Sequence, residues 1–480
     1  MNRVHNPTSK LPPEVVSRIF AFCPSVKCIA PADGASIPKM AQTLVLGGVC
    51  RRWRSIAWTT PSLWTGIRVF IEHQSPQLEE EMVGQWLARS GCLPLSIHVL
   101  PQRFMVLNSH ESVPPLIDIL NRYSSRWETL DLQIPLRFVS WFRGDSGPVS
   151  ILKNLFIRDY LDIFPFRNST STFILVNNCP TPAIVQVYGI PFRSLSISWN
   201  GVTHVRLGEI YGGELFHLLQ VAPFMTICNI TEVKEGDGGF GSPQDLTHHR
   251  LQDLNADYQS SAVAEPILSR LTLPSLTDFL YRDLSFGVLR SLMSRSSPPI
   301  RYLHIADVNA TEEEFIEIFY SIPTLEELAI YHLWLGEDFL KLLASTAIVS
   351  RDNGDVAKFL PKLVELTAWF EALYSWRTLA TIFPSGPVPS GHWRRPLKTV
   401  QIHCMCTDDE EFMDEEAVSQ LLAVRNAGIA LKATNAETGW DFIHESWKYL
   451  KSQKASDTEH AEDEDMEGAE DGSDDESKDE

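Results

Sequence analysis

Apolar residues recur along most of the chain in one short pattern: an apolar residue, two others, an apolar residue, one other, and a third apolar residue. Such alternation predicts a strand with one buried face. The pattern returns at intervals of about 25 to 40 residues, a spacing typical of stacked structural repeats. Well-formed copies are Trp127-Leu130-Leu132, Leu152-Leu155-Ile157, Phe192-Leu195-Ile197, Val202-Val205-Leu207, Ile300-Leu303-Ile305, Leu325-Leu328-Ile330 and Leu397-Val400-Ile402, and degraded copies are Leu276-Phe279-Tyr281 and Leu363-Leu366-Ala368.

Helical segments separate these strands. The clearest begins at Thr311, which can cap the helix while Glu314 bonds back to it, and another runs from about Asp408 to Ala427. Strand and helix in alternation predict a mixed α/β fold, and we expect residues 71–450 to form an irregular leucine-rich-repeat-like solenoid. A generic α/β domain is the alternative, because short strings of this pattern also arise by chance in apolar strands.

The first seventy residues differ from the repeats in their pattern of apolar positions. After a flexible N-terminus over residues 1–9, residues 10–70 predict a small helical domain, with one helix opening at Leu11, a loop over 23–39 and a second continuous helix from about Met40. A strand and a further helix follow. The apolar positions of these elements are Leu11, Val15 or Val16, Ile19, Phe20 and Phe22, then Val45, Val49, Trp53 and Ile56, then Ile67, Val69 and Ile71, and finally Met82, Val83, Trp86 and Leu87.

Two motifs in this domain resemble the F-box family. The first is Leu11-Pro12-Pro13-Glu14-Val15-Val16-Ser17-Arg18-Ile19-Phe20, and the second is Val49-Cys50-Arg51-Arg52-Trp53-Arg54-Ser55-Ile56-Ala57 followed by Pro61-Ser62-Leu63-Trp64. The layout of such a head ahead of a repeat region is similar to that of the F-box-like proteins of mushroom-forming fungi.

The resemblance implies a non-catalytic substrate-recognition subunit of a Skp-cullin-F-box ubiquitin ligase, which acts in ubiquitin-dependent protein degradation. The head would dock on a Skp-family adaptor, and through it on a cullin-RING ligase, while the repeats bind a protein substrate. Carried over by position, the adaptor contacts would be Leu11, Pro12, Val16, Ile19, Val49, Cys50, Trp53, Leu63 and Trp64. The alternative for these residues is that they form the core of the head itself.

One departure from the family bears on this function. The connection between the two motifs, residues 21–43, is longer and richer in proline than the usual F-box connection. A displaced middle helix would weaken adaptor docking. The alternative function is therefore a repeat-based protein-interaction scaffold that keeps an F-box-like head and has no ligase role.

The substrate is expected on the strand side of the repeats, where the residues between the apolar positions point outward. Candidate substrate-binding residues are His204, Arg206, Tyr302, His304, Glu327 and Gln401.

Net charge is −20 for the 480 residues, of which residues 451–480 contribute −11 from fourteen Asp and Glu against three Lys. The remaining −9 argues against nucleic acid as a partner, because no basic excess releases counterions. Residues 451–480 are expected to be a disordered acidic tail with possible phosphorylation at Ser456 and Ser473. Arg51, Arg52 and Arg54 form a local basic cluster, read as a solvated helix face or a contact with an acidic partner.

No motif predicts catalysis, a cofactor or a metal. Residues 236–241 are rich in glycine but lack the helix and the Lys-Ser/Thr pair of a phosphate loop, and His403-Cys404-Met405-Cys406 has no second ligand pair at zinc spacing. No apolar stretch reaches the roughly 18 residues that cross a bilayer, and the N-terminus has no apolar signal segment. We therefore expect a non-enzyme with no membrane partner that stays in the cytoplasm, the nucleus or both and is not secreted.

Overall fold

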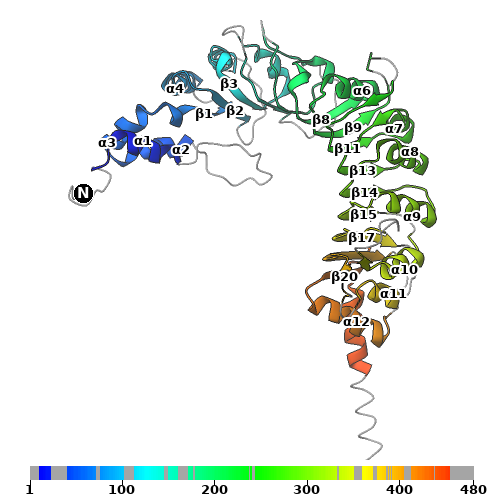
Figure 1. Cartoon of the computed structure of the whole chain (residues 1–480). Helices are drawn as coiled ribbons and strands as arrows, with labels where there is room; N and C mark the ends of the chain where they lie inside the picture. Colours follow the sequence, from blue (N-terminus) through cyan, green and yellow to red (C-terminus); the bar gives the residue numbers. More distant parts are fainter. Residues whose placement is uncertain are drawn as a thin grey trace, which may run out of the picture. The chain divides into compact units, whose positions relative to one another are not determined.

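The computed structural model describes residues 10–22, 40–71, 76–101, 113–144, 150–159, 171–176, 179–236, 238–240, 244–331, 335–350, 359–370, 376–384, 388, 390, 392–404, 412–436 and 438–453. It divides into two compact units, Met1–Leu271 and Thr272–Glu480. Each unit combines helices with parallel strands, so the expected mixed α/β class is confirmed (Figure 1). None of the helices in the described part combines the length and apolar character that crossing a membrane requires.

The head of unit 1 consists of α1 (Pro13–Phe22), α2 (Met40–Val49), α3 (Arg51–Trp58) and the short 3-10 helix η3 (Pro61–Trp64). The helix predicted from about Met40, with Val49 and Trp53 on one face, is divided at Cys50 into two helices. Cys50 has extended backbone angles, φ −161° and ψ 168°, and its sulfur accepts the Trp53 N–H at 3.4 Å. Cys50 is therefore the N-cap of a separate helix. The loop expected over residues 23–39 lies outside the described residues.

Tryptophans hold the head together and connect it to the first strand. The indole N–H of Trp64 donates to the Ala57 carbonyl at 2.8 Å, and its ring packs edge-on against Trp58 and Trp86, with centroids 5.2 and 4.5 Å away. Trp86 belongs to the next helix and donates to the carbonyl of Gly66, where the first strand begins. Trp86, Val83 and Leu87 are buried as predicted, whereas Met82 is exposed.

The strands of unit 1 are parallel and pair in sequence order. Helices and 3-10 turns connect them. The strands are β1 (Gly66–Ile71), β2 (Leu95–Pro101), β3 (Trp127–Gln133), β4 (Asn154–Arg158), β6 (Ile184–Val187), β8 (His204–Tyr211), β9 (Ile227–Lys234) and β11 (Asp253–Tyr258). The connections include α4 (Pro76–Arg89), α5 (Val113–Asn121), η4 (Ser124–Arg126), η5 (Leu136–Trp141), η6 (Phe192–Ser194), η7 (Trp199–Gly201), α6 (Gly212–Val221) and α7 (Ser261–Leu268).

Unit 2 repeats the same arrangement more regularly. Figure 1 shows its helices along one side of its strands. The strands, again parallel and in sequence order, are β13 (Asp278–Arg282), β14 (Tyr302–Ala306), β15 (Glu327–Tyr331), β17 (Glu365–Phe370), β19 (Thr399–Cys404) and β20 (Ala430–Asn435). The helices are α8 (Phe286–Ser296), α9 (Glu312–Ser321), α10 (Glu337–Ser345), α11 (Trp376–Thr381) and α12 (Glu415–Asn426), and a short antiparallel pair joins β16 (Ile348–Ser350) to β18 (His392–Arg394).

The core of unit 2 follows from the register of its strands. Leu303, Leu328, Leu366, Val400 and Leu431 occupy one continuous row across five strands, and all five are buried. A side chain two residues further along each strand points the same way and forms a second buried row. The alternate side chains point to the other face, which we call the open face of unit 2.

The repeated apolar strings lie on the parallel strands described above for each unit, with one exception. Phe192-Leu195-Ile197 falls on η6 and on β7 (Leu195–Ser196), which pairs only with β5 (Phe173–Ile174) in a separate two-stranded sheet. A 3-10 turn begins directly after Pro191, so these apolar residues do not form one continuous strand. The remaining short strand of unit 1, β10 (Leu246–Thr247), also lies outside the main sheet.

The sequence predicted where two helices, α9 and α12, begin. At α9, Thr311 accepts the Glu314 N–H at 3.3 Å while Glu314 accepts the Thr311 N–H at 2.9 Å, so the predicted capping box is confirmed. Helix α12 begins at Glu415 rather than near Asp408, because the Asp414 side chain caps it by accepting the Ala417 N–H at 3.0 Å. Residues 405–411, and the tail from residue 454 with Ser456 and Ser473, lie outside the described residues.

Candidate functional site

Helices α1 and α2 of the head expose large apolar side chains. Val15, Ile19 and Phe22 lie at positions i, i+4 and i+7 of α1, which places them on one stripe, and Phe22 is 88% exposed. Val45 and Val49 form a similar stripe on α2. Large apolar side chains that stay in water cost free energy, and groups of them mark surfaces that bind a partner. We call these five residues, together with Leu44, the exposed apolar residues of the head.

The adaptor contacts expected from the sequence separate into two groups. Val16, Leu63 and Trp64 are buried, with 1%, 6% and 1% of their surface exposed, which favours for these three the alternative that they form the core of the head. Trp53 is half-buried and packs against Phe20, with ring centroids 4.8 Å apart.

The remaining expected contacts are accessible. Ile19 and Val49 are about half exposed, Pro12 is exposed, and Leu11 and Cys50 are partly exposed. The Leu11 carbonyl accepts a hydrogen bond from the guanidinium of Arg52, which ties the segment before α1 to α3.

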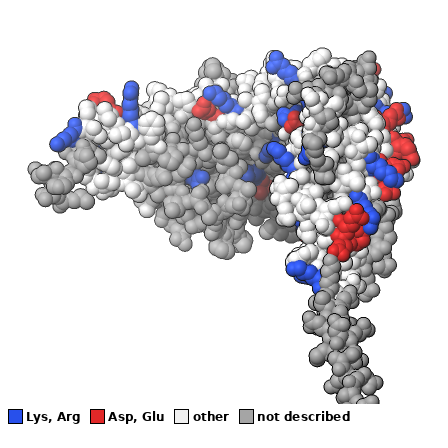
Figure 2. All heavy atoms as spheres, turned by 60° about the horizontal axis from the view of Figure 1, so that its bottom comes forward, with Lys and Arg blue, Asp and Glu red and all other residues white. Residues whose placement is uncertain are grey.

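The basic cluster on α3 is partly structural. The Arg54 Nε–H donates to the Gly47 carbonyl at 2.9 Å and so connects α3 to α2, and Arg52 bonds to Leu11 as described above. Arg51 is exposed. Over the face drawn in Figure 2, Lys and Arg are interspersed with acidic and uncharged residues.

The open face of unit 2 carries most of the expected substrate-binding residues. Tyr302, Glu327 and Glu365 are neighbours in one row across β14, β15 and β17. His304 and Gln401 belong to the next row, in which Ala329 and Thr367 lie between them. The register of parallel strands, rather than any loop, brings these side chains together.

Two carboxylates of this face lie directly opposite one another. Glu327 and Glu365 are register partners on adjacent parallel strands, whose backbones are about 4.8 Å apart. The Glu327 carboxylate is 3.1 Å from His304 Nε2. Glu365 is exposed and forms no ion pair with any described residue. Like charges in this arrangement repel each other and attract a cation.

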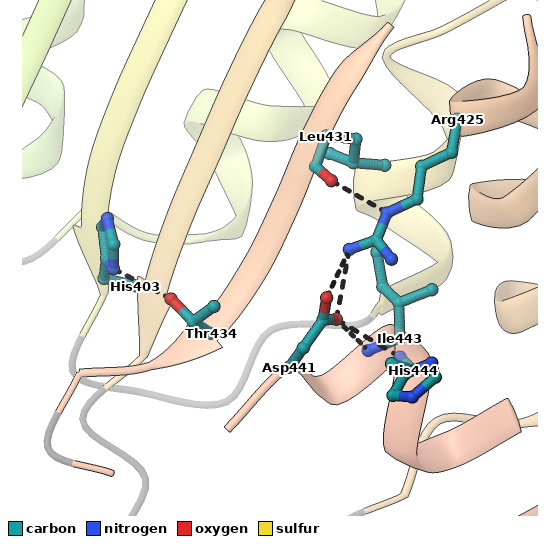
Figure 3. A network of polar contacts seen from close by, with 7 residues as sticks. All are labelled: His403, Arg425, Leu431, Thr434, Asp441, Ile443 and His444. Carbon is teal, nitrogen blue, oxygen red and sulfur yellow. Dashed lines mark hydrogen bonds and ion pairs between the residues drawn. The ribbon is translucent and has the colours of Figure 1, made fainter. Parts of the chain in front are cut away.

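An aromatic row crosses the same face at the far end of the strands. The Tyr331 and Trp369 rings meet edge to face with centroids 6.1 Å apart, and Trp369 lies 5.2 Å from His403. His403 Nδ1 and Thr434 Oγ1 are 3.0 Å apart, so β20 fixes the imidazole (Figure 3). Burial, and secondarily the charge of Lys432, lowers the pKa of His403, so the ring is neutral at pH 7.

The last strand of unit 2 is fixed from α12, as Figure 3 shows. The Arg425 guanidinium donates to the Leu431 carbonyl at 2.8 Å and to both oxygens of Asp441 at 3.1 and 2.9 Å. Asp441 Oδ1 also accepts the backbone N–H groups of Ile443 and His444. This network is structural support for β20 and the helical residues that follow it.

The other two expected substrate-binding residues lie in unit 1. His204 and Arg206 are both on β8, and Arg206 is exposed on the face opposite the buried Val205 and Leu207. His204 Nδ1 is 2.8 Å from the Thr203 hydroxyl.

Unit 1 also holds a buried ionisable pair that the sequence did not indicate. His98 Nδ1 is 3.1 Å from Asp131 Oδ2, both residues are buried, and Arg158 Nη2 is 3.7 Å from Asp131 Oδ1. The three residues lie on adjacent strands β2, β3 and β4. The buried carboxylate is compensated by two cationic or hydrogen-bonding neighbours, which is the usual way a buried charge is accommodated.

The described residues contain no candidate metal cluster. Among them no group of three or more His, Cys, Asp or Glu side chains could hold a metal ion. A cavity of about 470 Å³ between α8 and α9 is lined by Arg290 and Glu317, which neutralise each other at 2.7 Å, and by serines that include Ser294 and Ser321. Cys404 of the motif at residues 403–406 is buried on β19, and its residues 405 and 406 lie outside the described part.

The sequence missed the residues that complete the open face of unit 2: Tyr331, Glu365 and Trp369. Tyr331 and Trp369 directly follow Leu325-Leu328-Ile330 and the degraded string Leu363-Leu366-Ala368, and Glu365 lies inside the second string at the position that Glu327 has in the first. Applying the same alternation to the degraded string and extending both strings by one residue would have found them. The chain matches no protein-family model and no curated protein.

Proposed function

We propose that this chain is a protein-interaction subunit whose head docks on a Skp-family adaptor and whose repeat region holds a protein substrate for ubiquitination by a cullin-RING ligase. The observation that carries the proposal is the exposed apolar stripe of α1, with Val15, Ile19 and Phe22 in water beside a well-packed core. A three-helix unit with this arrangement needs a partner to cover the stripe.

The arrangement of the strands supports the second half of the proposal. In each unit, parallel strands follow one another in sequence order, with helices between them. Such repetition supports an irregular leucine-rich-repeat-like solenoid, in which the strand side is a continuous surface for a protein partner. The candidate surface is the open face of unit 2.

The experiment is a pull-down of the full chain with a purified Skp-family adaptor. The test variant combines Ile19→Asp with Val49→Asp, which places charges on two half-exposed positions of α1 and α2. The matched control is Val176→Asp, because Val176 is 46% exposed, close to the 48% of Ile19, and lies outside the head. Circular dichroism verifies that all three proteins keep their helical content.

We expect the full chain and Val176→Asp to retain the adaptor equally, and the double variant to bind about tenfold more weakly or not at all. Failure of the folded full chain to bind, or unchanged binding by the double variant, would overturn the ligase role. The chain would then be a protein-interaction scaffold with an F-box-like head.

A further inference from the structure

We propose that the open face of unit 2 binds an extended partner segment that presents a Lys or Arg side chain to Glu327 and Glu365 and a large apolar side chain to Tyr331 and Trp369. This inference rests on the proposed function, because it names the chemistry of the protein that the repeat region would hold. It follows from three features of the face: an acidic end, an aromatic end and a shallow floor between them.

The two carboxylates at the acidic end, those of Glu327 and Glu365, are suited to bind a cation. Glu327 and Glu365 are direct cross-strand neighbours, and of the two only Glu327 has a hydrogen-bonding partner within the described ranges, His304 at 3.1 Å. Glu365 is exposed and forms no ion pair with a described residue. A guanidinium or ammonium group placed between the two carboxylates would relieve their mutual repulsion and form charge-assisted hydrogen bonds.

Arg301, a basic residue close to this row, already pairs with another carboxylate. Arg301 precedes β14, and its guanidinium forms a bidentate ion pair with Glu326, at 3.0 and 2.7 Å. The same guanidinium lies over the Tyr302 ring, 5.4 Å from its centroid. Tyr302 therefore already faces a cation, and we leave it out of the proposed contacts.

The aromatic end is suited to an apolar side chain. Tyr331 and Trp369 contact each other edge to face, and both are partly exposed. His403, the next ring in the row, is held by Thr434 and is neutral at pH 7 because burial lowers its pKa. The nearby charge, Lys432, is positive and would repel a cation, so the two ends select different side chains.

The part of the open face between the acidic and the aromatic end is shallow at Ala329. Ala329, two residues after Glu327 on β15, lies between His304 and Thr367 in the register and is almost fully buried. Its methyl group leaves room for a backbone to pass above it. Glu327 and Tyr331 are four residues apart, about 13 Å along a strand, and an extended partner covers that distance in about four residues as well.

The partner is a basic segment of another protein rather than the acidic tail of this chain. Residues 451–480 carry a net charge of −11, so Glu327 and Glu365 would repel them. A segment that carries Lys or Arg is attracted by both the face and the tail, which raises its rate of association.

The test is calorimetric titration of the full chain with the peptide Ac-Ser-Arg-Ser-Ala-Ser-Leu-Ser-NH2 and with the same peptide in reversed order. Two comparison peptides isolate the proposed contacts. One replaces arginine by the neutral isostere citrulline, and the other moves leucine two positions closer to the arginine. The protein variants are Glu365→Gln and Trp369→Leu, both on the open face. The matched control is Glu313→Gln, which removes the same charge from the exposed first turn of α9 on the helix side of the unit.

We expect one of the two peptide orders to bind the full chain, and to bind about tenfold more weakly when arginine becomes citrulline, when leucine is shifted, or when the protein carries Glu365→Gln or Trp369→Leu. Glu313→Gln should bind as the unaltered chain does. The proposal is overturned if neither peptide order binds, if citrulline makes no difference, or if Glu313→Gln weakens binding as much as Glu365→Gln, which would show attraction to the overall acidity alone.

The two proposals can fail separately. No adaptor is present in the titration, and Ile19 and Val49 are in unit 1, so loss of the adaptor result leaves the peptide result intact. Adaptor binding without peptide binding would overturn only the inference about the open face.

Discussion

The carboxylate of Asp441 accepts hydrogen bonds from the Arg425 guanidinium through both of its oxygens, at 3.1 and 2.9 Å, and the pair joins α12 to the segment after β20. Both side chains are only partly exposed. The same carboxylate caps the helical residues that follow it, through the N–H groups of Ile443 and His444. The Asp441 side chain therefore forms the ion pair with Arg425 and also caps the start of the helix that follows.

Replacing Asp441 should reveal both roles. We expect Asp441→Ala to lower the free energy of unfolding by about 2 kcal/mol, the sum of a lost cap and a lost partly buried ion pair. Asp441→Asn keeps a capping oxygen and should cost only about 1 kcal/mol. Urea denaturation followed by circular dichroism measures both values. Equal effects of the two variants would show that the cap contributes nothing, and no effect of Asp441→Asn would show the same of the ion pair. Glu445→Ala, which breaks an exposed pair with Lys448, serves as control.

A buried arginine should dominate the stability of unit 2. Arg395 is 7% exposed and donates five hydrogen bonds, to the carbonyls of Leu343, Thr346, Phe359 and Leu360 and to the Thr346 hydroxyl. Arg395→Met would remove the guanidinium from all of these acceptors and should cost about 3–5 kcal/mol. Lys398→Met, at an exposed position nearby in sequence, should stay within about 0.5 kcal/mol. A small loss for Arg395→Met would mean that water replaces the guanidinium.

The pKa of Arg395 predicts how its contribution to the stability of the chain depends on pH. Burial lowers its pKa to about 10, so the guanidinium stays charged at pH 7. Its pKa is lower in the folded than in the unfolded chain, so folding becomes more favourable only as pH rises through about 10. We therefore expect Arg395→Met to cost the same at pH 6 and pH 8.5, measured by urea denaturation at both values. A cost that differs between these two pH values would contradict the assignment.

A buried histidine should make unit 1 sensitive to acid. His248 Nδ1 accepts the Leu251 N–H at 3.0 Å, and its Nε2 donates to the Ala222 carbonyl at the end of α6, at 3.1 Å. Burial is the main cause that lowers the pKa of His248. The unfolded chain therefore binds a proton more readily, and stability falls as pH drops below about 6.5.

The comparison is between pH 7.5 and pH 5 in urea denaturation. Protonation at Nδ1 removes the bond from Leu251, which costs about 1–3 kcal/mol. His248→Gln should be less stable than the unaltered chain at pH 7.5 and should lose less stability on acidification. His249→Gln, at the exposed neighbouring position, should follow the unaltered chain. Identical acid sensitivity in His248→Gln would assign the effect to other groups.

The N-cap of α3 can be improved. Cys50 has the extended backbone of an N-cap, but its sulfur is a weak acceptor at 3.4 Å from the Trp53 nitrogen. Cys50→Ser supplies a stronger acceptor at the same place and should stabilise the chain by about 0.5–1 kcal/mol. Thermal unfolding of Cys50→Ser and of Cys92→Ser, at an exposed free thiol, compares them. A lower melting temperature for Cys50→Ser would show that burial of the thiol outweighs the cap.

The sequence predicted those parts of the fold that depend on short-range patterns. Thr311 and Glu314 cap α9 as expected because both partners lie within one turn. The repeated apolar strings found most strands, because each places its own side chains in the core. Strands β2, β6, β9 and β11 were missed. In β9 and β11, Asn229, Glu232 and Asn255 interrupt the apolar pattern, and only pairing with neighbouring strands defines these two.

The candidate binding surfaces could be predicted only in part, because they depend on contacts between residues far apart in the sequence. Tyr302, His304, Glu327 and Gln401 could be named from their place between apolar positions, and the structure places all four on the open face. That Glu327 lies beside Glu365 depends on the register between β15 and β17, which no local pattern gives. In the head, the break at Cys50 depends on a hydrogen bond to Trp53, and a hydrophobic pattern that continues through residue 56 conceals it.

The contacts of Arg395 also bear on the order in which the chain folds during its synthesis. Each strand from β14 to β20 in the main sheet of unit 2 pairs with the main-sheet strand made before it, so that sheet can grow one strand at a time as the chain leaves the ribosome. The end of α10 is different, because the carbonyls of Leu343 and Thr346 find their donor about fifty residues later in the chain. If synthesis stopped between β17 and Arg395, the strands already made could pair, but the end of α10 would lack the hydrogen bonds from Arg395. These bonds can form only after residue 395 has been made.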